Sequence, residues 1–383
     1  MNKLKSKMII IIAIMTIITT GCNISAINTA NPKDNIEENE DENQEKENDL
    51  EDSDKSEDKE DEKKDNEKEE EKQVKEIDLQ KVKPNEAGQV MVLMYHSIGE
   101  PEGQFRRTPD NFRKDLKILY EKGYRPISLE DYVTGNITTE AGYTPIVLTF
   151  DDGWQDNFNL IETKNNKTKI DPDCAVAILE EFNKKHPDFP LEATFFVNMY
   201  PFGQQKYIKE KLKYIVDKGM DIGNHTINHA NFSKANITKI QKELSGIVKM
   251  VNNNIDYNVN TLSLPFGERP DNKDLYKYLE SGEYEGTEYK NIAILNVGWD
   301  PDKSPYHNKF NRHSIHRIRA SDLEKYVQGV GMYDWMKHFE TGARTKYISD
   351  GNSDIVTVPK GFEDVIDDDK IKNKNLRVYT IKK

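Results

Sequence analysis

The stretch "TPIVLTFDDGW" (144–154) places two adjacent carboxylates, Asp151 and Asp152, directly after an apolar run. The run predicts a buried strand, and the glycine after the carboxylates predicts a turn. Asp-Gly pairs are common in ordinary turns. Two carboxylates at one buried strand end nevertheless repel each other unless a cation or a shared proton relieves them. We therefore interpret this strand end as part of a site.

On both sides of this strand, apolar runs alternate with amphipathic stretches. The strand-like runs are 91–98, 144–150, 191–198, 220–225, 260–267, 291–299 and 314–320, and the helical ones are 108–124, 173–186, 206–219 and 237–254. We expect the first helix to be capped by Asp110 and to stop at Gly123. The alternation predicts parallel β/α units, and a barrel rather than a dinucleotide-binding sheet, because no Gly-rich phosphate turn follows a strand. Barrels of this kind carry their chemistry at the carboxyl ends of the strands.

One such strand end carries "HTINH" (225–229), in which His225 and His229 form the only histidine pair spaced by four residues. Histidines at i and i+4 can lie on one face of a helical turn and bind one metal ion. With the double aspartate they give an Asp/His/His set that leaves coordination positions open. Such a set suits a hydrolytic metal that activates water rather than a closed structural site.

The first 86 residues differ in composition from the rest. Lys3, Lys5 and Lys7 precede the apolar run 8–18 and "TTGC", which predicts a secretory signal of lipoprotein type over 1–22 that ends at a lipidated Cys22. An ordinary signal peptide with an incidental cysteine is the alternative. Residues 36–76 hold 22 acidic residues and 8 lysines, so the rest of the chain is nearly neutral. We expect 23–86 to be a disordered tether, or alternatively an acidic binding tail.

The domain itself is expected over 87–320, followed by a C-terminal extension, 321–383, of unknown role. Cys174 has no cysteine partner once Cys22 is lipidated, so the domain is expected to rely on its core rather than on disulfides. We find no basic stripe that would indicate a nucleic-acid partner. We expect an extracellular monomer anchored to the membrane by its lipid.

The motifs "TFDD" (149–152), "HTINH" (225–229) and "LPFG" (264–267) resemble those of the NodB-homology polysaccharide deacetylases, carbohydrate esterase family 4. The resemblance implies a distorted (β/α) barrel with one divalent metal, commonly Zn²⁺, with Co²⁺, Ni²⁺ or Mn²⁺ as alternatives. It implies that Asp152, His225 and His229 hold this metal and that Asp151 is the general base. It also implies that the backbone N–H of Phe266 faces the developing oxyanion.

Two positions depart from the family pattern. Ser263 stands where the family has an arginine that orients the base. Either Arg317 supplies that cation, or Arg317 is an ordinary charge at a strand edge and the base is held less tightly. The family's Leu-x-x-His acid is missing after "LPFG", but Leu93-x-x-His96 supplies it at the front, as in the circularly permuted poly-N-acetylglucosamine deacetylases. His316 is the competing acid.

Together with the expected lipid tether, the resemblance implies a hydrolase that removes N-acetyl groups from an extracellular N-acetylglucosamine polymer, either a poly-N-acetylglucosamine-like exopolysaccharide or a cell-wall glycan. Trp154 and Trp299 are candidates for the substrate pocket, with Arg317 as a further one. An O-acetyl polysaccharide esterase would use the same residues. A degenerate surface lipoprotein that only binds polysaccharide is the other alternative.

Overall fold

The computed structural model describes residues 77–164 and 167–382. The expected signal peptide, Cys22 and most of the tether lie outside these residues. Within the described ranges, no helix is both long enough and apolar enough to cross a bilayer.

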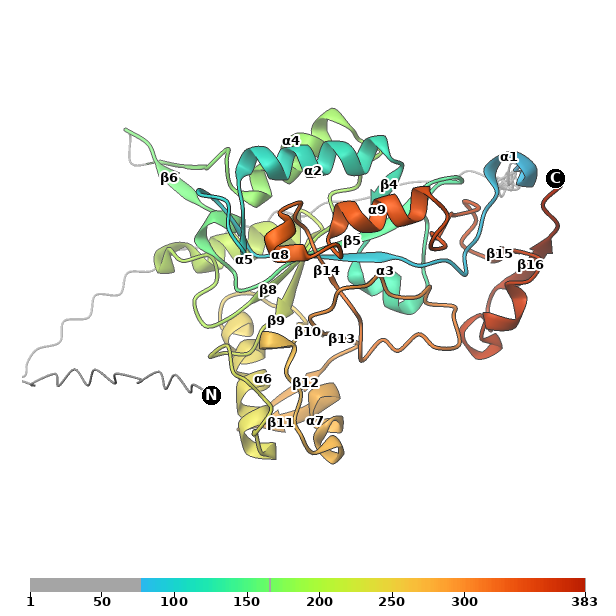
Figure 1. Cartoon of the computed structure of the whole chain (residues 1–383). Helices are drawn as coiled ribbons and strands as arrows, with labels where there is room; N and C mark the ends of the chain where they lie inside the picture. Colours follow the sequence, from blue (N-terminus) through green and yellow to red (C-terminus); the bar gives the residue numbers. More distant parts are fainter. Residues whose placement is uncertain (1–76, 165–166, 383) are drawn as a thin grey trace, which may run out of the picture. The chain divides into compact units, whose positions relative to one another are not determined.

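A single sheet of eight strands lies at the centre of the domain (Figure 1). Its order is β13-β10-β9-β8-β5-β1-β14, with β4 also paired to β5, and every pair is parallel. The strands are β1 Met91–Tyr95, β4 Tyr124–Pro126, β5 Thr144–Phe150, β8 Thr194–Val197, β9 Asp221–Asn224, β10 Thr261–Ser263, β13 Ala293–Leu295 and β14 Ile318–Arg319.

The segment before β14 brings the two ends of this sheet together. Ile315 forms a parallel bridge with Leu295 of β13, and three residues later Ile318 pairs with Leu93 of β1. The sheet is thereby curled into a distorted barrel, which confirms the predicted fold class. The circular permutation stays a prediction.

Helices and short strand pairs surround the sheet. The helices are α1 Leu79–Val82, α2 Pro109–Glu121, α3 Leu129–Thr134, α4 Ala175–Lys185, α5 Ile208–Asp217, α6 Ile237–Asn252, α7 Lys277–Glu280, α8 Glu324–Val327 and α9 Met332–Glu340. The short pairs are β2 Ser97–Ile98 with β3 Arg106–Arg107, β6 Leu160–Glu162 with β7 Thr168–Ile170, β11 Ser281–Tyr284 with β12 Thr287–Lys290, and β15 Ile355–Pro359 with β16 Asn375–Tyr379.

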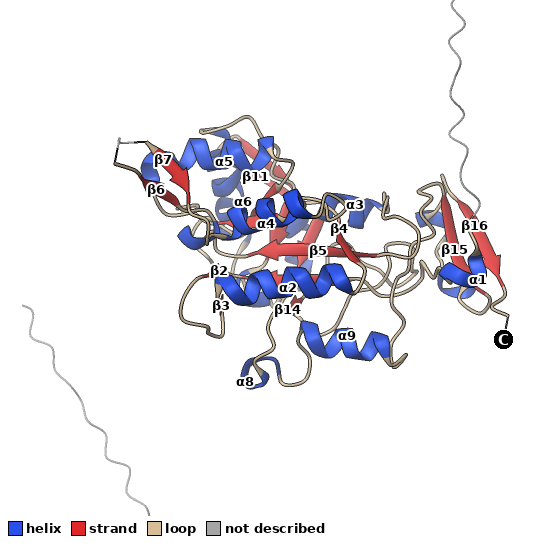
Figure 2. Ribbon diagram, turned by 90° about the horizontal axis from the view of Figure 1, so that it is seen from above, coloured by secondary structure: helices blue, strands red, loops and turns tan. Residues whose placement is uncertain are grey.

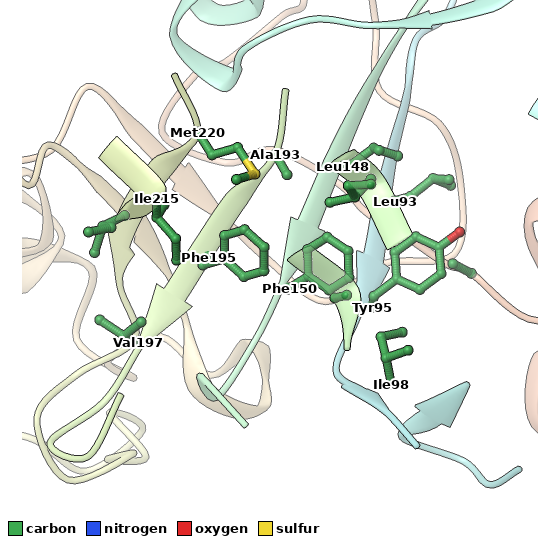
Figure 3. Packing of buried hydrophobic residues seen from close by; sticks show 14 of the residues in the cluster. Leu93, Tyr95, Ile98, Leu148, Phe150, Ala193, Phe195, Val197, Ile215 and Met220 are labelled. Carbon is green, nitrogen blue, oxygen red and sulfur yellow. The ribbon is translucent and has the colours of Figure 1, made fainter. Parts of the chain in front are cut away.

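Alternate residues of the central strands enter two different apolar clusters, as the two-residue period of a strand requires. Tyr95, Phe150 and Phe195 belong to the first cluster, which includes side chains of α2, α4, α5 and α6. Figure 3 shows these three rings side by side, with centroids 5.2 Å and 4.9 Å apart. Val147 and Phe196 point to the other face and belong to the second cluster. Both faces of the sheet are therefore buried.

The C-terminal extension is part of both clusters. Met332, Trp335, Met336 and Phe339 of α9 belong to the first, and β15 contributes Val356 and Val358 to the second. The helices α8 and α9 are separate, because Gln328 and Gly329 between them adopt left-handed φ angles of 52° and 78°.

The boundary expected at residue 87 is too late. α1 lies within the segment assigned to the tether, and Gln80 of α1 bonds the carbonyl of Thr380. The carboxylate of Glu86 is 3% exposed and accepts the N–H groups of Asp350 and Thr357. These partners lie more than 250 residues away in the chain, so local sequence pattern cannot reveal them. In Figure 2, α1, β15 and β16 gather at one end of the sheet.

Burial, together with the nearby Asp350 carboxylate, raises the pKa of Glu86 to about 8 from its ordinary 4.5. The folded state therefore binds more protons than the unfolded state between these two values. The stabilisation is fully present below about pH 4.5 and is lost as the pH rises to about 8.

We expect the free energy of unfolding to fall with pH across this window, by up to about 1.4 kcal/mol per pH unit for one proton. Denaturant unfolding at several pH values measures the slope. Glu86→Gln should flatten it, because its side chain cannot titrate. Equal slopes in the two proteins would contradict the assignment.

Candidate active site

Three parallel strands end at the same edge of the sheet, and each is followed by a residue predicted to belong to the site. β1 ends at Tyr95, paired with Phe150 at the end of β5, so that His96 and Asp151 follow side by side. β9 lies beyond β8 and ends at Asn224, so His225 emerges along the same edge. Parallel pairing thus gathers residues from distant parts of the chain.

Asp152, His225 and His229 form one cluster whose possible ligand atoms all lie within 4.8 Å of one another. The Oδ1 atom of Asp152 is 3.2 Å from Nε2 of His225 and 3.1 Å from Nε2 of His229. Burial raises the pKa of Asp152, but hydrogen bonds from the two imidazoles outweigh it and hold the pKa well below the ordinary range. The Asp152 carboxylate is therefore ionised at neutral pH.

The two histidines do not lie on a helical turn, contrary to the sequence prediction. Residues 225–229 form an irregular turn in which Thr226 and His229 have φ angles of 59° and 51°. Two hydrogen bonds fix this turn, from the Thr226 N–H to the side chain of Asn224 and from the Ala230 N–H to the Thr226 hydroxyl. Left-handed backbone therefore brings the two rings together, with centroids 5.0 Å apart.

The donor set fits a divalent metal. Nδ1 of His225 lies 2.8 Å from the carbonyl oxygen of Ser263, a contact in which only the nitrogen can donate, and Nε2 is the ring atom directed at Asp152. Such an outer hydrogen bond is a regular feature of metal-binding histidines. One carboxylate and two imidazoles with open positions suit a catalytic Zn²⁺ or a similar ion. Asp152, His225 and His229 would hold it.

Asp151 points to the other side of the strand end, where Arg317 meets it. Two guanidinium nitrogens donate to the two carboxylate oxygens, each at 2.7 Å, and Arg317 is 0% exposed. Arg317 also donates to Ser263 Oγ at 2.8 Å, and Ser263 Oγ lies 3.3 Å from Asp151. Burial alone would raise the pKa of Asp151, but the Arg317 charge lowers it to about 2.

Of the two alternatives for Arg317, the structure favours the first. The side chain is not an ordinary strand-edge charge, because it is buried and bidentate to the predicted base. It is also not a substrate-pocket residue, since its donors are taken by Asp151, Thr149, Ser263 and the carbonyl of Asn296. Ser263 occupies the position of the expected arginine and contacts the guanidinium that comes from elsewhere.

His96 lies beside this pair. Burial lowers its pKa to about 4, against the opposing effect of the nearby Asp151 and Asp152 carboxylates. The imidazole is therefore neutral at neutral pH, and it must receive a proton before it can donate one. Its ring is 4.9 Å from that of Phe105. His316, the competing acid, is held instead by the Asp300 carboxylate at 2.9 Å, and its N–H bonds Asp302.

Phe266 has a φ of 61° inside the turn Pro265–Gly267, and its ring contacts that of His229 at 4.7 Å. The two hydrogen bonds of this turn come from the N–H groups of Gly267 and Glu268, so the Phe266 N–H takes no part in them. The turn follows β10 directly. Its position beside His229 suits the predicted role of oxyanion donor.

Exposed aromatic side chains lie on the loops that follow β5, β8 and β13. The indole N–H of Trp154 donates to Asp152 at 3.0 Å, and Trp299 is 68% exposed while its carbonyl accepts the Trp335 indole. Sequence reasoning missed Tyr200, which is also exposed. Its loop is fixed by hydrogen bonds from Met199 to Ile227 and from Phe202 to Gly153, both in the motif-bearing turns. No sequence pattern marks it.

The polysaccharide deacetylase family model matches residues 139–285. The chain contains a polysaccharide deacetylase domain of the NodB-homology type. The matched residues include Asp151, Asp152 and the two histidines of the cluster. His96 and Arg317 lie outside the match, one on each side of it.

YxkH from Bacillus subtilis strain 168, whose provisional name is polysaccharide deacetylase, is 23% identical over 256 residues, which cover 65% of this chain and 78% of YxkH. The crystal structure of BA0330 from Bacillus anthracis covers 64% of this chain and 69% of its own, with 20% identity and a TM-score of 0.46. The Streptococcus pyogenes deacetylase PplD, solved with acetate, covers 64% and 98%, with 18% identity and a TM-score of 0.45.

His225→Ala should remove a ligand from the deacetylase cluster and lower the metal content of the purified protein. Metal analysis after dialysis against Zn²⁺ measures this directly, with His313→Ala as a control that also removes one imidazole. Normal occupancy in His225→Ala would disprove the ligand assignment.

Arg317→Met should destabilise the domain by about 3–5 kcal/mol, because it leaves the buried Asp151 carboxylate without its partner. Denaturant unfolding measures the loss. Adding Asp151→Asn should recover part of it, because the second change removes the buried charge. Additive losses in the double variant would show that the two side chains are not coupled.

Proposed function

We propose that the deacetylase domain hydrolyses N-acetyl groups of an extracellular N-acetylglucosamine polymer, with one divalent metal held by Asp152, His225 and His229. The observation that carries the proposal is that two adjacent carboxylates at the end of β5 face different partners. Asp152 faces two imidazoles, while the adjacent Asp151 is buried, ionised and fixed by Arg317. A carboxylate held beside a potential metal site is the arrangement needed to activate water.

The chain's own residues take the following roles in the proposed reaction. When bound, the metal would polarise the acetyl carbonyl and lower the pKa of a water at the site. Asp151, oriented by Arg317, accepts a proton from the attacking water. The Phe266 N–H donates a hydrogen bond to the oxyanion that develops on the carbonyl oxygen.

His96 then protonates the leaving amine, since expulsion of an unprotonated amide nitrogen is slow. Because burial keeps this imidazole neutral, the proton has to reach it from the water through Asp151. His96 and Asp151 directly follow the paired ends of β1 and β5, and the Asp151 carboxylate acts electrostatically on the His96 imidazole, which supports this route.

The polymeric and extracellular nature of the substrate is supported by sequence rather than by geometry. A lipoprotein-type signal and an acidic tether suit an enzyme that acts on an envelope or matrix glycan. The arrangement "LMYH" before "TFDD" supports the permuted type of deacetylase. The exposed Trp154, Tyr200 and Trp299, on the loops after β5, β8 and β13, offer aromatic faces on which sugar rings can pack.

Acetate release by the Zn²⁺-loaded protein should be compared on chitin oligomers, poly-N-acetylglucosamine, peptidoglycan and acetylxylan. Release from an N-acetylated polymer supports the proposal. Release from acetylxylan alone would show an O-acetyl esterase, and binding without release from any polymer would show a non-catalytic surface protein.

His96→Ala should reduce turnover on the best substrate by about 10²- to 10⁴-fold, the usual contribution of a general acid. Its metal content should stay normal, because His96 is not one of the three proposed ligands. His316→Ala is the matched control and should keep its activity. If His316→Ala loses turnover while His96→Ala retains it, the acid is misassigned.

A further inference from the structure

Lys211 of α5 is a fully buried lysine. Its side chain is 0% exposed and lies on the helix face that also buries Leu212 and Ile215, where an apolar residue would be expected. Its ammonium donates a hydrogen bond to the carbonyl oxygen of Phe202 at 2.6 Å. In the part of the chain that the structure describes, no carboxylate lies within ion-pair distance of it. Burial lowers the pKa of Lys211 to about 8, so this charge is kept inside the protein at a cost in stability.

The carbonyl that Lys211 contacts belongs to a residue with an uncommon backbone conformation. Phe202 has a φ of 58°, which is rare for a bulky side chain, and its buried ring packs against those of Phe158 and Phe195. The Phe202 N–H donates to the carbonyl of Gly153 at 2.7 Å. The two peptide groups that flank the α-carbon of Phe202 are therefore both fixed, one by Lys211 and the other by Gly153.

Gly153 belongs to the turn that carries a proposed metal ligand. Asp152 and Gly153 have consecutive left-handed φ angles of 72° and 59°, so contacts from outside the turn must hold this backbone. The loop that contains Phe202 also reaches the turn of the two histidines, where the Met199 N–H donates to the carbonyl of Ile227 at 3.1 Å. One loop thus contacts both turns that carry the proposed ligands, and Lys211 binds that loop from behind.

We propose that Lys211 is a positioning residue for the metal site, whose buried ammonium holds the Phe202 loop in the conformation that directs Asp152 at His225 and His229. The proposal rests on the proposed function and adds a residue that touches neither metal nor substrate. It explains why a charge stands at a position suited to an apolar side chain. An apolar side chain would fill the space, but it would leave the Phe202 carbonyl without a donor.

The test measures the affinity of the metal-free, full-length protein for Co²⁺ by competition with a chelator. Lys211→Met should raise the Kd about ten-fold, at the lower end of the effect of groups that orient metal ligands, because Lys211 acts through Phe202. The visible absorption of bound Co²⁺, which reports the geometry of its ligands, should change as well. The free energy of unfolding should change little, since removal of the buried charge offsets the unpaired carbonyl.

Two control variants of α5 separate positioning from stability. Ile215→Ala removes a buried side chain from the same helix face, so it should destabilise the domain but leave the Kd of the folded protein unchanged. Lys213→Met removes the same charge from a side chain that is 63% exposed and should leave both quantities unchanged. A wild-type Kd in Lys211→Met would overturn the proposal, as would an equal rise of the Kd in Ile215→Ala.

Hydrogen exchange of the metal-free protein gives a second readout that does not depend on metal binding. The segments 150–156 and 198–203 should exchange faster in Lys211→Met than in the wild type, because both lose their support. If the wild type binds no Co²⁺, the metal assignment of the proposed function fails. Faster exchange would then still support the hold of Lys211 on the Asp152 turn, whereas equal exchange would overturn it.

Lys211→Gln covers the case in which Lys211→Met does not fold. Its amide keeps an N–H donor on a shorter side chain that reaches less far towards the Phe202 carbonyl. The Kd for Co²⁺ should again rise, and exchange of the two segments should again be faster. Wild-type values of both quantities in Lys211→Gln would overturn the proposal.

Discussion

The site depends on how one strand end separates two adjacent negative charges. Asp151 and Asp152 leave β5 together, and two ionised carboxylates so close repel each other unless each has its own cation. Asp151 turns inward to a buried arginine, whereas Asp152 adopts a φ of 72° and turns to the histidines. The backbone conformation at Asp152 is uncommon for a residue with a side chain, and surrounding contacts must hold it.

This separation explains why the barrel has to close where it does. The cation for Asp151 comes from the segment that bridges β13 and β1, 166 residues further along the chain. If those two ends of the sheet did not meet, the buried carboxylate would lack its partner. The proposed base therefore has its cationic partner only when the barrel is closed. Ser263 suits this arrangement, because its small side chain leaves room for the Arg317 guanidinium.

Much of the fold could be predicted from the sequence, because buried strands and amphipathic helices each have a characteristic local pattern of apolar residues. The grouping of Asp152, His225 and His229 was also predictable, since these residues stand at or just after strand ends. The local backbone was not, because spacing alone suggested a helical turn at 225–229. The predicted cap of α2, Asp110, was wrong. Thr108 caps the helix and Pro109 follows it, whereas Asp110 lies inside the first turn. Roles that depend on distant partners could not be settled. Arg317 had two open alternatives, and the buried position of Glu86 depends on residues near the C-terminus.

The gathering of α1, β15 and β16 at one end of the sheet has a consequence for orientation. β1 runs from that end towards His96, so the first described residues and the catalytic edge lie at opposite ends of the strands. The whole length of the central strands therefore separates the α1 end of the domain from the residues proposed to react.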